Sequence, residues 1–311
     1  MARTPVTGST RPGSSTLDSA DLWSRLSRTI LRVATAVMGA TVPLLSERLD
    51  AVSDASALTS AVSLWVMWAI VLFCVLVPST VSLTALRLVA PAHLVVTGLL
   101  VVGNLIDDPS TAVVLAIVPT LVVTVFGFAA ETGAWFVQAS AYGDERRVPL
   151  RPPLGFVVVQ VSAWAMWVSS LIVGTSALVR ETWLAGGILV AIGVAFTIVL
   201  PTRFHRLSRR WLVFVPAGVV LHDHVALAET AMFGRTAVAS FSVAPRTANL
   251  ADLSGRSKGT GVAVELHDFD TVVLAATPRT PGGSALHVKS FWVRPSRPGR
   301  AISSWNDGRS T

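Results

Sequence analysis

The chain contains 311 residues, of which 52% are hydrophobic and only 14% are charged, and its mean hydropathy is +0.62. Ordinary soluble domains carry roughly 25% charged residues, so this composition excludes a purely soluble protein and requires a second, apolar environment. The whole net charge of +7 arises after residue 202, because residues 1–202 carry 11 basic and 11 acidic side chains, whereas residues 203–311 carry 14 and 7.

The N-terminal region divides into a polar tail and a helix. Residues 1–16 are rich in Ser, Thr, Gly, Pro and Arg and predict a disordered tail. From Asp18, apolar residues recur at helical spacing and three arginines share another face, which predicts a basic amphipathic helix on an inner-leaflet surface. The charge-free stretch 33–45 that follows is short for the roughly 20 residues of a span. A span that starts at Thr29 is long enough.

Five clearer candidates for membrane spans fill the middle of the chain, which we assign as a helical bundle over residues 17–202. They are 60–83, 88–106, 111–130, 154–179 and 182–200.

The connections between these spans predict their orientation. Arginine marks alternate connections, at Arg87, at 146–151 and at 203–210, and the positive-inside rule places that set in the cytoplasm. Six spans then put both termini on the cytoplasmic side of a bacterial plasma membrane. A bacterial source also fits the composition, because arginine greatly outnumbers lysine, as in proteins of high-GC bacteria. The alternative has five spans and an external N-terminal helix.

Short β-type runs follow Arg210 and predict a cytoplasmic β-rich domain over residues 203–299, with a flexible tail at 300–311. In the clearest strand, Val262, Val264 and Leu266 alternate with less apolar residues, as in a strand with one buried face. The fold class is thus an α-helical transmembrane bundle of five or six spans, followed by a small, mainly antiparallel sandwich or open barrel.

This domain resembles the bacterial PH-like domains found in membrane proteins, many of them actinobacterial. The resemblance rests on a strand, turn and strand at 210–219 and on a late hairpin at 262–266 and 271–274. It covers about a third of the chain, and the closing amphipathic helix of such domains is matched only poorly by residues 285–293. The resemblance implies a module that faces lipid or docks a protein, with no catalytic residues.

Three groups of residues are candidate functional sites. A basic run at the start of the domain is suited to anionic inner-leaflet lipids or a partner. A stripe of small residues in the last span allows another helix to approach, in the same chain or in a homo-oligomer. Two polar residues near the end of an apolar run are candidates for an intramembrane polar site, although an interfacial position explains them more simply. These groups are Arg203, Arg206, Arg209, Arg210 and Trp211; Gly187, Ala191 and Ala195; and Glu131 and Gln138.

Signals for chemistry are weak. His222, Asp223, His224 and Glu229 are metal-ligand types, but a bend between strands explains them and we expect no metal. The single cysteine, Cys74, excludes a CxxC site, and the common hydrolase, phosphate-loop and zinc-protease motifs are missing from the sequence.

We therefore expect a protein without a cofactor that acts as an integral membrane scaffold or interaction protein, presenting a basic PH-like domain to the inner leaflet or to a protein partner. The alternative is a small transporter or membrane-embedded enzyme that acts through the bundle, with a site among Glu131, Gln138 and the loop 146–151. Nucleic-acid binding through the basic region is disfavoured, because the positive-inside rule already explains its charge.

Overall fold

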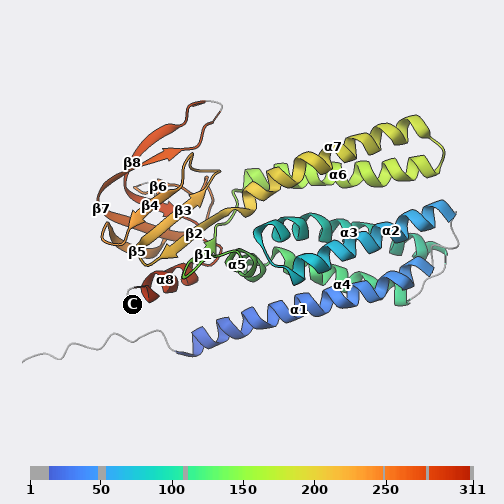
Figure 1. The fold of residues 1–311 in the computed structure, drawn as a ribbon, viewed down its shortest axis with the longest axis horizontal. Helices are drawn as coiled ribbons and strands as arrows, with labels where there is room; N and C mark the ends of the chain where they lie inside the picture. Colours follow the sequence, from blue (N-terminus) through green and yellow to red (C-terminus); the bar gives the residue numbers. More distant parts are fainter. Residues whose placement is uncertain (1–13, 48–53, 108–110, 248, 278–279, 309–311) are drawn as a thin grey trace, which may run out of the picture.

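The computed structural model describes residues 14–47, 54–107, 111–247, 249–277 and 280–308 (Figure 1). A bundle of long helices lies at one end of the molecule, and a β domain caps the other end. Most of the predicted tail at residues 1–16 lies outside the described residues. The first helix begins at Ser14.

Six long helices run side by side (Figure 1). They are α1 (Ser14–Glu47), α2 (Asp54–Leu76), α3 (Thr80–Asp107), α4 (Thr111–Phe128), α6 (Leu154–Val179) and α7 (Trp183–Ser208). Within the described residues, five of them are long and apolar enough to cross a membrane; α4 reaches that length only together with the short helix α5 (Ala130–Ala139), from which it is bent by 66°. The length and composition of these helices confirm the prediction of five or six helices that could cross a membrane.

The connection between α2 and α3 differs from the prediction. We expected spans at 60–83 and 88–106 with Arg87 in the loop, but the helices are joined by residues 77–79. The Ser79 hydroxyl accepts a hydrogen bond from the backbone N–H of Ser82 (3.0 Å) and so caps the start of α3. Arg87 consequently lies about two turns inside the helix.

The β domain contains two four-stranded sheets. The first sheet has the order β1–β2–β3–β4, and the second has the order β5–β7–β8–β6. All pairings are antiparallel except that of β6 with β8. The strands are β1 (Arg146–Pro149), β2 (Arg210–Val215), β3 (Gly218–Asp223), β4 (Ala231–Gly234), β5 (Val238–Pro245), β6 (Ala251–Asp252), β7 (Thr260–Leu274) and β8 (Ser284–Val293).

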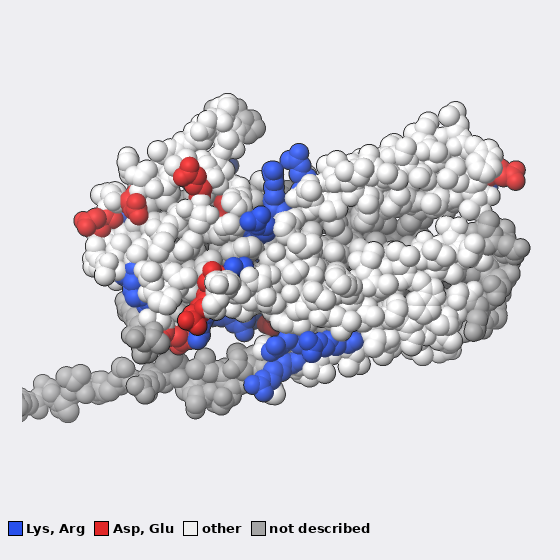
Figure 2. Space-filling model, in the orientation of Figure 1, with Lys and Arg blue, Asp and Glu red and all other residues white. Residues whose placement is uncertain are grey.

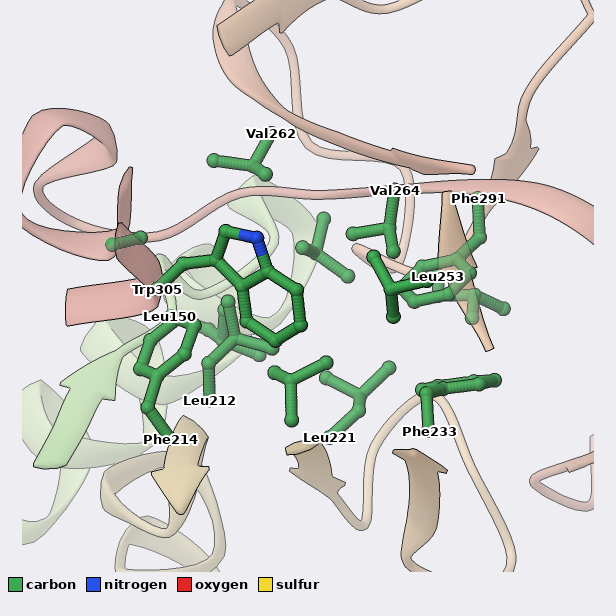
Figure 3. Close-up of a cluster of buried hydrophobic side chains, with 14 of the residues drawn as sticks. Leu150, Leu212, Phe214, Leu221, Phe233, Leu253, Val262, Val264, Phe291 and Trp305 are labelled. Carbon is green, nitrogen blue, oxygen red and sulfur yellow. The ribbon is translucent and has the colours of Figure 1, made fainter. Parts of the chain in front are cut away.

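A C-terminal helix closes this domain, where we had predicted a flexible tail. Helix α8 (Pro298–Asp307) buries Ala301 and Trp305, and the indole of Trp305 lies between residues of the two sheets (Figure 3). The stretch 285–293, the poor match for a closing helix, lies within strand β8. The prediction took Pro298 as a residue that prevents a helix. A proline in the first turn of a helix is compatible with helix formation.

The β domain also begins earlier than residue 203. Strand β1 precedes α6, and it pairs antiparallel with β2, which follows α7; Val148 lies opposite Leu212. The hairpin of α6 and α7 is therefore inserted between two neighbouring strands of one sheet.

Candidate functional site at the junction of helices and sheets

Strand β2 fastens the β domain to the helices, because both of its faces are buried. Leu212 and Phe214 point into the core between the sheets, whereas Trp211 and Val213 pack against helix residues such as Phe136. Alternate side chains of a strand point to opposite faces, so one short strand joins two hydrophobic cores.

Arg210, which we predicted as a lipid- or partner-contacting residue, instead forms a buried ion pair. Its Nε and Nη2 donate to the two carboxylate oxygens of Asp223, each at 2.7 Å, and both side chains are 0% exposed. The guanidinium also donates to the carbonyl oxygens of Arg151 (3.1 Å) and Ser254 (3.2 Å). Arg210 thus joins β2, β3, the segment before α6 and the loop after β6.

Trp211 is likewise buried, between two polar side chains. Its ring stacks on His222 at 4.9 Å, and the Arg147 guanidinium lies 5.3 Å from the ring centre. Burial and the nearby positive charges of His224, Arg209 and Arg147 lower the pKa of His222 to about 4. This histidine is therefore neutral at physiological pH.

The other three arginines of the predicted basic run are exposed. Arg203 and Arg206 lie on the last turns of α7, and Arg209 follows that helix. Figure 2 shows basic side chains gathered where the helices meet the β domain and along the neighbouring part of α1. The predicted clustering of positive charge at one end of the bundle is present.

A cavity of about 550 Å³ lies at this junction. Its walls come from α3, the α4–α5 bend, the segment after β1, α6, and the end of α7. The lining residues used below are Thr84, Arg87, Pro91, Phe128, Arg151, Val157, Gln160, Val161, Trp164, Phe204 and Ser296.

Arg87 is the most unusual residue of this cavity. Its Nε donates to the carbonyl oxygen of Gly127 (3.2 Å), and its guanidinium lies 5.7 Å from the ring centre of Phe128. None of the ion pairs between described residues includes Arg87. A cation inside an apolar bundle without a carboxylate is costly, so this site favours an anion.

The wall formed by the β domain adds to this positive character. Arg151 lines the cavity. Burial of Arg294 and, to a smaller extent, the nearby charge of Arg151 lower the pKa of Arg294. Ser296 also lines the cavity, and its buried hydroxyl has no hydrogen-bond partner among the described residues. Three arginines therefore line the cavity: Arg87 and Arg151, together with Arg210, whose charge is already paired with Asp223.

Neither residue of the predicted intramembrane polar site lines this cavity, and both make structural contacts on α5. Glu131 forms an ion pair with Arg297, which directly precedes α8. The Gln138 amide donates to the carbonyl oxygen of Glu145 (2.8 Å) and accepts from the N–H of Arg147 (2.9 Å). These contacts hold α5 against the β domain, while Phe136 and Val137 of the same helix pack against the long helices.

The stripe of Gly187, Ala191 and Ala195 is exposed on the outer face of α7. Nothing lies within 4 Å of a Cβ built on Gly187, whereas Gly186 and Gly193 face side chains of α6. The small residues that bring α6 and α7 together are therefore offset from the predicted stripe.

The described residues contain no group of three His, Cys, Asp or Glu side chains that could hold a metal ion. Asp223, the centre of the suspected ligand set, accepts hydrogen bonds from Arg210 and from the N–H groups of Val225 and Ala226.

Comparison of the chain with protein-family models, with curated proteins and with solved structures found no match. The function is therefore argued from the site alone.

Sequence reasoning missed the importance of Arg87 and Ser296. The Pro78-Ser79 pair was the available signal for Arg87, because proline and a capping serine mark the helix start seven residues before it. No local signal distinguishes Ser296, which reaches the cavity only through the tertiary fold.

Proposed function

We propose that this protein is an integral membrane scaffold that holds a PH-like domain against the anionic inner leaflet of a bacterial plasma membrane. The insertion of the α6–α7 hairpin between β1 and β2 carries the proposal. Since neighbouring strands of one sheet flank the hairpin, the domain cannot leave the membrane surface without losing its first strand.

The domain architecture is compatible with the PH-like assignment. Two four-stranded sheets enclose one core, and a C-terminal amphipathic helix closes it with Trp305. A scaffold role needs such a compact, outward-facing module more than it needs a catalytic centre.

Exposed arginines supply the contact with lipid. Arg203, Arg206 and Arg209 form a belt beside the domain, and Arg32 of α1 lies at the same end, with its guanidinium 5.2 Å from the ring centre of Trp135 in α5. Each basic residue near an anionic leaflet contributes about 1 kcal/mol of attraction. The belt therefore orients the bundle with the domain in the cytoplasm and gathers anionic lipid around it.

The test compares the full-length protein with a triple variant, Arg203→Gln, Arg206→Gln and Arg209→Gln, each purified in polymer-bounded membrane discs. We expect the ratio of anionic to zwitterionic lipid around the wild type to exceed that of the bulk membrane, and the triple variant to approach the bulk ratio. Arg180→Gln, an exposed charge at the turn between α6 and α7, is the control. Equal enrichment in wild type and triple variant would overturn the proposal.

A further inference from the structure

We propose that the junction cavity binds one phosphate-bearing membrane lipid, with its phosphate at the Arg87 end and part of an acyl chain between α3 and α6. This site is separate from the arginine belt, since Arg203, Arg206 and Arg209 do not line the cavity.

The charge of the cavity selects an anion. Arg87 and Arg151 both line it, and no Asp, Glu, His, Lys or Cys side chain appears among its described lining residues. Guanidinium groups bind phosphate through charge-assisted hydrogen bonds, and the lack of an acid or base in the lining favours binding over catalysis.

The shape of the cavity selects an amphiphile over a free anion. On α3 the lining runs from Leu83 to Pro91, and on α6 it runs from Val157 to Trp164, which lies seven positions further along the helix. Seven residues of helix correspond to about 10 Å. Apolar side chains, among them Val161 and Phe204, line much of the cavity. The cavity therefore combines guanidinium groups with apolar surface.

The packing of α6 explains how a chain can enter. Only Val168, Ser170 and Gly174 are buried along its 26 residues. Helix α6 packs mainly against α7, so much of the rest of its surface is not covered by the described protein. The indole of Trp164 donates to the carbonyl oxygen of Leu88 (3.0 Å) and links α6 to α3 at the inner end of the cavity. A lipid chain beside this link fills space that protein side chains leave open.

Two variants test the two ends of the site separately. Arg87→Gln removes the charge, and Val161→Phe fills the apolar end without any change of charge. Native mass spectrometry of the full-length protein, delipidated and titrated with phosphatidylglycerol, measures occupancy of the first bound lipid. We expect each variant to weaken that binding by about 10-fold or more, since a hydrogen bond to a charged group or a filled binding pocket has effects of this size.

Three ligands distinguish the alternatives. Diacylglycerol with the same chains lacks the phosphate, and inorganic phosphate lacks the chains, so we expect both to bind at least 10-fold more weakly than phosphatidylglycerol. Equal binding of diacylglycerol would overturn the role of the charge, and equal binding of inorganic phosphate would overturn the role of the chain. Unchanged binding in Val161→Phe would also contradict the proposal, whatever the stability of Arg87→Gln.

The belt variant keeps this inference separate from the scaffold proposal. Arg203→Gln, Arg206→Gln and Arg209→Gln together should lower the enrichment of surrounding anionic lipid and leave the first bound lipid in place. Loss of that lipid in the belt variant, with retention in Arg87→Gln, would place the site on the belt and overturn the cavity assignment.

Discussion

The helices α1–α4 and the hairpin of α6 and α7 are held in the molecule in different ways. In the strongest apolar window, 39% of residues are buried in α1 and in α3 and 22% in α2, against 17% in α7 and 11% in α6. The first group is held by side chains packed along its length, such as Leu31, Met38 and Val75 in one shared cluster. The hairpin is held mainly at one end, where β1 and β2 pair directly before and after it.

This difference shows that an inserted hairpin needs little lateral packing when its two ends belong to one sheet. The pairing of β1 with β2 fixes the spacing of the hairpin ends, and Arg210 ties that sheet to the segment before α6. A space beside α6 can therefore remain open without loss of the fold.

The largest effect should come from breaking the ion pair at this attachment. Arg210→Met leaves the buried carboxylate of Asp223 without its partner, and such a change costs about 3–5 kcal/mol. Thermal unfolding of the purified protein in detergent should show a large fall in midpoint temperature. Arg146→Met is the control, because the Arg146–Asp307 pair is more than half exposed and contributes at most about 1 kcal/mol. Similar effects in both variants would contradict the structural role of Arg210.

Two glycine substitutions in α7 compare the face of this helix that packs against α6 with its exposed face. A Cβ on Gly193 would collide with Leu171 of α6, so Gly193→Ile should destabilise the hairpin by about 1–3 kcal/mol. Gly187→Ile, six residues earlier on the open face, should leave the unfolding of the isolated protein unchanged. A change in oligomeric state in Gly187→Ile alone would instead reveal a helix partner for the stripe of Gly187, Ala191 and Ala195.

Acid should weaken the sheet at its contact with the helices. The pKa of His222 is lowered to about 4 from an ordinary value of 6.5, mainly by burial, so the unfolded chain binds a proton that the folded chain does not bind between these pH values. The stabilisation is complete above about pH 6.5 and is lost as the pH falls toward 4. His222→Gln should reduce the slope of midpoint temperature against pH in this range, and the exposed His267→Gln should not. An unchanged slope in His222→Gln would exclude this histidine as the titrating group.

Much of the helical architecture could be predicted from the sequence, because membrane spans depend on local length and hydropathy. The sharpest failure, at Arg87, came from weighting charge over helix capping: an arginine was assigned to a loop although Pro78 and Ser79 mark the turn. In the β domain, the strand with alternating Val262, Val264 and Leu266 was recognised, since one buried face gives a period of two.

The site could not be predicted, because it depends on contacts between distant segments. The pairing of β1 with β2 joins residues more than 60 positions apart, and β1 has only four residues. The exposed positions of Arg203, Arg206 and Arg209 agree with a surface belt, whereas Arg210, next in the sequence, turns inward because of Asp223. Neighbouring arginines look alike in a sequence, and only the partner across the sheet separates them.

The smallest effect should come from the two tryptophans of α6. It tests directly how the hairpin is attached to the helices α1–α4. Trp164 donates to the carbonyl oxygen of Leu88 in α3, and Trp167 donates to the hydroxyl of Thr197 in α7 (2.8 Å). Phenylalanine removes either donor and leaves a smaller ring, and the lost hydrogen bond alone costs about 1 kcal/mol. Trp164→Phe should loosen the hairpin from the bundle, and Trp167→Phe should loosen α6 from α7. Spin labels on α3 and α6 should report a broader distance distribution in Trp164→Phe alone. If both variants broaden it equally, the contact of α6 with α7 positions α6 relative to α3 as much as the Trp164 hydrogen bond does, and the two attachments are not separate.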